Sequence, residues 1–137
     1  PDVDAPLSEA DLGVALAVRE ALRELALANN GGTVGPDALA TLARAARAAN
    51  ISVAFGPGGA TRLVPAAGGL DGALGRLLAI VHDAQVDGSW RRLKTCRRDV
   101  CHWLYYDRSR NGSSTWCAMS VCGNRTNTKR YRARRRG

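Results

Sequence analysis

Four cysteines, all in the last third of the chain, constrain the fold most strongly. Cys96 and Cys101 enclose four residues, Cys117 and Cys122 also enclose four, and fifteen residues separate the two pairs. Two short loops of equal length can converge on one tetrahedral Zn²⁺ through four thiolates. Two disulfides of a secreted module are the alternative. The equal short spacings favour the metal, so we predict one zinc ion as the cofactor.

The segment that carries these cysteines needs a metal ion or another cross-link to be stable. A unit below about 50 residues rarely stabilises itself by burial alone, and the binding free energy of zinc adds directly to folding. Four thiolates leave no open coordination position, so the predicted metal is structural and not catalytic. His102, beside Cys101, is then redundant as a ligand. The large apolar residues on which this segment depends are Trp90, Leu93, Trp103, Leu104, Trp116 and Val121.

Charge divides the chain at the same place. Residues 1–89 contain six arginines, no lysine and ten acidic residues, a balance of −4. Residues 90–137 contain fourteen lysines and arginines against only Asp99 and Asp107, a balance of +12. We therefore predict two domains, 1–89 and 90–137. The one-sided charge of the second predicts a polyanionic partner, either nucleic acid or an acidic membrane surface. No apolar run approaches the length of a membrane span, so we expect no membrane insertion.

The second cysteine pair predicts where the last helix begins. Five residues along an α-helix turn through about 500°, so Cys117 and Cys122 would point about 140° apart if both lay inside a helix. Cys117 is therefore expected in a loop or at the helix start, and Cys122 in an early turn of a helix that runs to about Arg135. Without the metal, self-repulsion should melt this helix. Its predicted nucleic-acid contacts are Arg125, Lys129, Arg130, Arg132, Arg134 and Arg136, joined by Arg108 and Arg110 on a preceding turn.

The first 89 residues predict three amphipathic helices and a hairpin. A capping box formed by Ser8 and Asp11 opens the first helix, which Asn29 and the residues after it end. Pro36 lies in the first turn of the second helix, and the third spans about residues 70–87. Strand-favouring residues at 51–55 and 61–65 flank a glycine-rich turn that lacks the Gly-Lys-Ser/Thr of a phosphate loop.

The cysteine-rich segment predicts a small finger. Residues 103–106 favour a strand, residues 107–114 a turn, and the chain then returns to the second cysteine pair. A zinc knuckle, this β-hairpin and the terminal helix would form a treble-clef-like zinc finger. The predicted fold class is mainly α with a small β-hairpin, a helical N-terminal region preceding the finger.

Residues 1–89 show little evidence of a catalytic site. They contain no cysteine, a single histidine, His82, and carboxylates scattered along helix faces. A lone histidine on a mostly apolar helix is more often a hydrogen-bonded structural residue than a catalytic base. We therefore predict that the chain is not an enzyme.

Four motifs in the last third resemble one family. LKTC, C-x-W-L-Y-Y-D-R-S-R-N, W-C-x-M-x-V-C-G-N-R and K-R-Y-R-A-R-R-R are similar to the CGNR zinc finger family over about residues 92–136. The resemblance implies that Cys96, Cys101, Cys117 and Cys122 are the zinc ligands and that the basic helix contacts double-stranded DNA. It also implies a bacterial transcription regulator located in the cytoplasm with the nucleoid.

In that family the finger follows a helical region called the ABATE, or stress-induced transcription regulator, domain. The stretch R-L-V-P-A-A-G-G-L at 62–70 resembles that domain less specifically. Family members have a further N-terminal portion, so we expect residues 1–89 to lack it, and any small-molecule effector pocket built from it to be incomplete. Gly123 is expected to permit close backbone approach near the metal, and Asn124 to hydrogen-bond a ligand thiolate or a turn.

Together these features predict a zinc-dependent DNA-binding transcription regulator. Its N-terminal region would sense a ligand or dimerise, and a two-fold homodimer is the expectation for a protein that reads palindromic sites. An RNA-binding module is one alternative, with Trp103, Tyr105, Tyr106 and Trp116 as stacking platforms. A zinc-stabilised finger that binds an acidic protein is the other.

Overall fold

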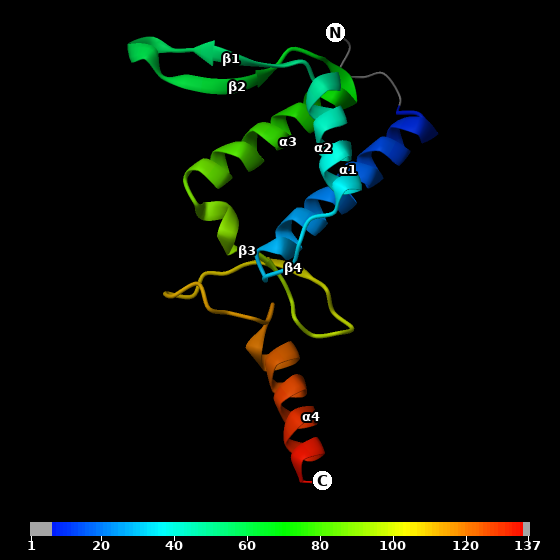
Figure 1. Cartoon of the computed structure of the whole chain (residues 1–137), viewed down its shortest axis with the longest axis vertical. Coiled ribbons are helices and arrows are strands. Elements are labelled where there is room, and N and C mark those ends of the chain that lie inside the picture. The colour runs from blue at the N-terminus through cyan, green and yellow to red at the C-terminus, as the bar shows by residue number, and fades with distance from the viewer. Residues whose placement is uncertain (1–6, 136–137) are drawn as a thin grey trace.

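The structure, a computed structural model, describes residues 7–135. Three helices, α1 (Glu9–Ala28), α2 (Pro36–Ala48) and α3 (Gly69–Val86), pack together at one end of an elongated molecule. A fourth helix, α4 (Asn124–Arg134), projects from the other end (Figure 1). The described chain is thus a mixed α/β protein in which helices predominate.

The predicted capping box opens α1. The Ser8 backbone N–H donates to Asp11 Oδ2 at 2.8 Å, and the Asp11 N–H donates to Ser8 Oγ at 3.2 Å. These two bonds satisfy N–H groups that the first helical turn leaves without intrahelical partners. Pro36 lies at the start of α2, where its missing N–H costs nothing. All three predicted N-terminal helices are therefore confirmed.

The core between these helices is small and built largely from short side chains. Val18, Ala45 and Leu74 are buried together at its centre. A methyl group added to Gly75 would lie 2.6 Å from Ala49 Cβ and 2.7 Å from Pro65 Cβ, so α3 packs there without room for a side chain. Partly buried leucines surround the centre at positions Leu22, Leu42, Leu70 and Leu78.

The predicted hairpin follows α2. Strands β1 (Ile51–Phe55) and β2 (Thr61–Pro65) pair antiparallel, with Ile51 opposite Pro65. Between them Gly58 and Gly59 adopt φ values of +72° and +80°, a region that favours glycine. The glycine-rich segment is therefore a hairpin turn, as predicted, and it leads into a strand instead of a helix.

The second sheet differs from its prediction. Strand β4 (Leu104–Tyr106) forms where expected, but it pairs with β3 (Leu93–Thr95), which precedes the first cysteine pair. The expected partner lay after the 107–114 turn. In that turn the Asp107 carboxylate accepts the backbone N–H groups of Ser109 and Ser114, so these two donors do not take part in a ladder. The first cysteine loop instead becomes the connection between the paired strands.

Side chains at the C-terminal end of α1 hold β3. Asn30 Nδ2 donates to the Thr95 carbonyl at 2.5 Å, and the Thr95 N–H donates to Asn30 Oδ1 at 3.3 Å. Asn29 Nδ2 donates to the carbonyls of Trp90 and Leu93, each at 2.8 Å. We call Asn29 and Asn30 the amide clamp, because their side chains bond the backbone of β3 and of the residues just before it.

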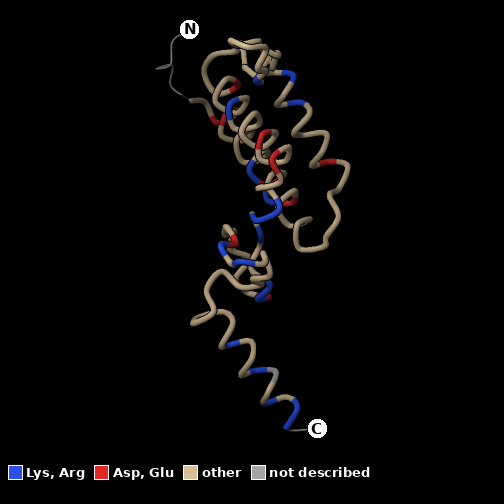
Figure 2. Tube along the Cα trace, turned by 90° about the vertical axis from the view of Figure 1, so that its left-hand side faces the viewer, with Lys and Arg blue, Asp and Glu red and all other residues tan. Residues whose placement is uncertain are grey.

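Charge is distributed as the sequence predicts. Lysines and arginines follow α4 along its length, whereas both signs alternate over the three-helix end (Figure 2). Across residues 7–135, none of the helices combines the length and the hydropathy that crossing a bilayer requires.

Candidate metal centre and basic helix

The four cysteine sulfurs lie together between the β3–β4 sheet and α4. All four Sγ atoms are within 4.8 Å of one another. The Cys101–Cys117 and Cys117–Cys122 sulfur pairs are each 3.7 Å apart. A tetrahedral Zn²⁺ with Zn–S bonds of about 2.3 Å requires sulfurs about 3.8 Å apart. The arrangement therefore fits one zinc ion, which these four residues could hold.

The distances do not fit disulfides. Bonded sulfurs lie about 2.05 Å apart, and all four cysteines are free thiols in the structure. Cys96 and Cys122 are each only 2 % exposed, so the site is enclosed on two of its sides. The disulfide alternative is therefore not what the structure shows.

The first pair is positioned by the connection between β3 and β4. Cys96 follows β3 directly, and its N–H donates to the Trp103 carbonyl at 2.9 Å. The Cys101 N–H donates to the Arg98 carbonyl at 2.9 Å, which closes a tight turn. His102 adopts a left-handed φ of +49°. We call residues 96–101 the first knuckle, and it presents both thiols to the same side.

The second pair is positioned by the start of α4. Cys117 lies in a bend, and Cys122 lies in a π turn (Met119–Gly123) that leads directly into α4. The N–H groups of Cys122 and Gly123 both donate to the Ala118 carbonyl, at 2.8 and 3.3 Å. This wider turn brings Cys122 back over Cys117. The expected loop position of Cys117 and early-turn position of Cys122 are thus observed.

Gly123 leaves no room for a side chain beside the cysteines. A Cβ atom there would lie 2.2 Å from Met119 Sδ and 2.9 Å from Trp116 Cδ1. Its φ of −63° is ordinary for any residue, so the requirement for glycine here is steric. The side chains of Trp116 and Met119 therefore pack directly on Gly123, and the expected approach of its backbone to the metal stays a prediction. Asn124 differs from its expectation: within residues 7–135 its exposed side chain bonds neither a thiolate nor a turn.

The free thiols influence one another strongly. Burial and contact with the neighbouring thiols raise the pKa of Cys117 to about 12. Burial also acts to raise the pKa of Cys122, but hydrogen bonds from Arg98 and the other thiols outweigh it, and this pKa is lowered. Arg98 Nη1 lies 3.9 Å from Cys122 Sγ. Zinc must therefore displace protons when it binds, which makes its affinity dependent on pH.

A buried ion pair supports the turn after β4. The Asp107 side chain is fully buried and lies 2.8 Å from Lys94 Nζ. It also accepts bonds from the Ser109 N–H and hydroxyl and from the Ser114 N–H. Burial alone would raise the pKa of Asp107, but the bonds from Lys94 and Ser109 lower it well below the usual range. The sequence predicts the turn at Asp107 but not this ion pair, although an Asp two residues before a Ser is typical of such turns.

The two histidines lie outside the cluster. No histidine of residues 7–135 joins the four cysteines. His82 is exposed and hydrogen-bonds the adjacent Asp83 at 3.3 Å. The backbone carbonyl of His102, not its ring, accepts a bond from Arg23 Nη2 at 2.7 Å.

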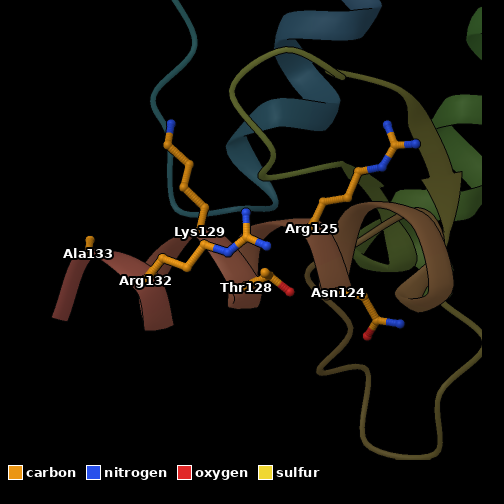
Figure 3. A pocket seen from close by; sticks show the side chains of 6 residues that line it. All are labelled: Asn124, Arg125, Thr128, Lys129, Arg132 and Ala133. Atoms are coloured by element: carbon orange, nitrogen blue, oxygen red, sulfur yellow. The ribbon is translucent and has the colours of Figure 1, made fainter. Parts of the chain in front are cut away.

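The basic helix presents its cations to solvent. Arg125, Lys129 and Arg132 lie along one shallow hollow of α4, together with Asn124, Thr128 and Ala133 (Figure 3). None of the ion pairs formed within residues 7–135 involves these three cations. Arg134 is also exposed on α4. Arg108 and Arg110 are exposed on the turn after β4. The Arg130 side chain and all of Arg136 lie outside the described residues.

Comparison with protein families matched the cysteine-rich segment. No curated protein matched the chain. The sequence model of the CGNR zinc finger family matches residues 92–135, which include β3, β4, all four cysteines and α4. This segment is therefore similar to a CGNR zinc finger, in agreement with a four-cysteine cluster that could hold one zinc ion.

Proposed function

We propose that this protein is a zinc-dependent transcription regulator that binds double-stranded DNA through α4. The observation that carries the proposal is the junction between the metal centre and the helix: Cys122 lies in the turn that opens α4. Beyond that junction the helix is exposed and strongly basic. A metal that holds the helix start would thus determine where the cations point.

The charge of α4 supports a polyanionic partner. Arginine exceeds lysine twelve to two in residues 90–137. The guanidinium group pairs in a bidentate way with phosphate oxygens and with guanine edges, and its planar fork holds that geometry more rigidly than the lysine ammonium does. Asn124 and Thr128 share the hollow of α4 with the cations, and both side chains can hydrogen-bond base edges (Figure 3). This combination suits a duplex groove better than a bare charge attraction.

The finer assignments extend the same proposal. A paired strand, a knuckle and a helix that share four thiolates suggest a treble-clef-like finger. The three-helix region would be an ABATE-like domain that senses a small molecule or dimerises, and the protein would act in the bacterial cytoplasm at the nucleoid. We assign no catalytic step, because four thiolates would leave zinc without an open position for water or substrate.

Single-stranded RNA is a second candidate, favoured by one specific observation. Trp103 is 68 % exposed and Tyr106 is 49 % exposed, so neither ring is absorbed by packing around the metal centre. Exposed aromatic rings close to arginines can stack unpaired bases. Tyr105 and Trp116 are half-buried and less suited to this role.

Selection of bound duplexes from a random DNA pool would test the proposal. The protein is incubated at near-physiological salt with excess RNA as competitor, and a parallel sample is first stripped with a chelator. We expect an enriched sequence motif that disappears on chelation. Displacement by RNA would favour the second candidate, and absence of all nucleic-acid binding would leave an acidic protein partner.

A double substitution connects the binding to α4. Lys129→Ala with Arg132→Ala should reduce the slope of log K against log salt by about 0.9 for each phosphate that these two side chains neutralise. An unchanged slope would remove α4 from the interface. Arg44→Ala with Arg47→Ala, which removes two exposed charges from α2, is the matched control.

A further inference from the structure

A second basic groove lies between the first knuckle and α4. It has a volume of about 430 Å³, and its walls include Arg97, Arg98, Asp99 and Val100 on one side and Arg125 and Lys129 on the other. Arg125 and Lys129 also line the hollow of α4 shown in Figure 3. These two residues therefore form the boundary between the groove and the hollow.

Both knuckle arginines are held in place by contacts at the ends of their side chains. Arg97 Nη2 donates to the Asn30 carbonyl at 2.9 Å. Arg98 Nη1 lies 3.9 Å from Cys122 Sγ. Each contact uses one of the five N–H donors of a guanidinium, so donors remain for a ligand. A ligand that meets arginines already held in place loses less side-chain entropy than one that must order free side chains.

The charges of the groove are unbalanced. It carries four cations and one carboxylate, Asp99. The ion pairs found among residues 7–135 include none of the four cations. Arg98 would offset part of the negative charge of a zinc tetrathiolate, which leaves Arg97, Arg125 and Lys129 against Asp99, an excess of two positive charges. Their convergence on one groove is the arrangement expected for a phosphate group.

We infer that this groove binds a backbone phosphate of the DNA duplex whose bases face the hollow of α4. The inference rests on the proposed function, and it assigns phosphate contact to the first knuckle. The turn that carries Arg108 and Arg110 lies on the other side of the β3–β4 sheet from the knuckle (Figure 1). Neither arginine lines the groove. Phosphate contacts position a protein on DNA, so this contact would set the depth and angle of α4.

Two substitutions that change the charge of the groove in opposite directions test the inference without altering a cysteine or an arginine. Val100 is 76 % exposed, and neither its side chain nor that of Asp99 makes a hydrogen bond or an ion pair within residues 7–135. Val100→Glu places a carboxylate in the groove, and Val100→Gln is its neutral control. Asp99→Asn removes the existing carboxylate. Zinc content is measured for each variant.

The readout is the affinity for a short duplex over a range of salt concentrations. Val100→Glu should weaken binding by about fivefold, the effect of one unit charge at about 4 Å in a water-like dielectric, and reduce the salt slope by about 0.9. Asp99→Asn should tighten binding by about fivefold. Val100→Gln should behave as the unaltered protein, and so should Arg91→Gln, which removes the same unit of charge from an exposed position before β3 that does not line the groove.

Equal reductions in affinity from Val100→Glu and Arg91→Gln would show an effect of net charge alone and overturn the inference. Unaltered binding by Val100→Glu would do the same while leaving the role of α4 intact. If Val100→Glu loses zinc, Asp99→Asn decides: tighter binding supports the groove, and unchanged binding overturns it. A failure of the unaltered protein to bind any duplex would overturn the proposed function and the inference together.

Discussion

At the scale of single residues, Gly123 shows how the motif and the metal centre are connected. Gly123 follows Cys122 and directly precedes α4, and its missing side chain is what lets Trp116 and Met119 pack against the turn. The resemblance predicts a close approach of the backbone near the metal at this position. The structure adds the two side chains that make glycine necessary.

Gly123→Ala should therefore destabilise the finger. The added methyl group must displace the Trp116 ring as well as the flexible Met119 side chain, and such overpacking typically costs about 1–3 kcal/mol. Denaturant unfolding of the zinc-loaded protein would measure the decrease in stability. Gly13→Ala is the control, because nothing lies within 4 Å of its Cβ position inside α1, and it should stabilise by about 0.5–1 kcal/mol. Equal effects of the two variants would contradict the packing argument.

Asp107 is the second residue whose role depends on burial. Its carboxylate accepts hydrogen bonds from Lys94 Nζ and from the backbone N–H groups of Ser109 and Ser114. Removal of the carboxylate would deprive all three donors of this acceptor. Lys94, whose side chain is 13 % exposed, would keep only carbonyl partners at Gly112 and Ser114.

Asp107→Ala should consequently cost about 3–5 kcal/mol of folding free energy, the usual cost of leaving a buried charge unpaired. Thermal unfolding monitored in the presence of zinc would measure it. Asp99→Ala removes a carboxylate from an exposed site and should change stability by less than about 0.5 kcal/mol. A destabilisation at Asp107 no greater than that at Asp99 would show that the ion pair contributes nothing net.

At the scale of elements, the amide clamp connects α1 to β3. The Asn30 side chain hydrogen-bonds both the N–H and the carbonyl of Thr95, as the backbone of a neighbouring strand would at the free edge of β3. Cys96 follows at once, and the clamp therefore supports one side of the metal centre.

Asn30→Ala should expose that edge. Two backbone groups of a buried residue would be left without partners, at a cost of about 1–3 kcal/mol. Hydrogen exchange at the Thr95 amide should become faster, while amides of α2 should keep their protection. Thr33→Ala, an exposed position in the loop after α1, is the control. Unaltered exchange at Thr95 would contradict the clamp.

The second prediction at this scale concerns α4. Its eleven residues are fewer than an isolated helix needs to be stable in water, and they carry several like charges. The helix leaves the body of the molecule and has its main contacts with the preceding π turn (Figure 1).

Removal of zinc should therefore melt α4 while the three N-terminal helices persist. Far-UV circular dichroism before and after chelation would measure a partial loss of helical signal, which added zinc should restore. Full retention of the signal would show that α4 is stable without the metal. Complete loss would show that the three-helix end also depends on it.

At the scale of the whole molecule, the helical end and the finger differ in how readily the sequence revealed them. Hydrophobic periodicity and helix-cap residues are local signals in the sequence. The helices α1, α2 and α3 and the β1–β2 hairpin could therefore be predicted from residues close together in the chain. The cysteine set followed from spacing. Which segment pairs with β4 did not, because a three-residue strand carries too weak a pattern to identify its neighbour.

The sequence by itself determined the local elements, the division of charge and the four residues that could hold zinc. The tertiary structure alone decided the pairing of β3 with β4, the ion pair of Lys94 with Asp107, the amide clamp and the groove between the first knuckle and α4. These features join residues 9 to 65 positions apart. Their existence depends on how the chain packs, and neither spacing nor propensity encodes that.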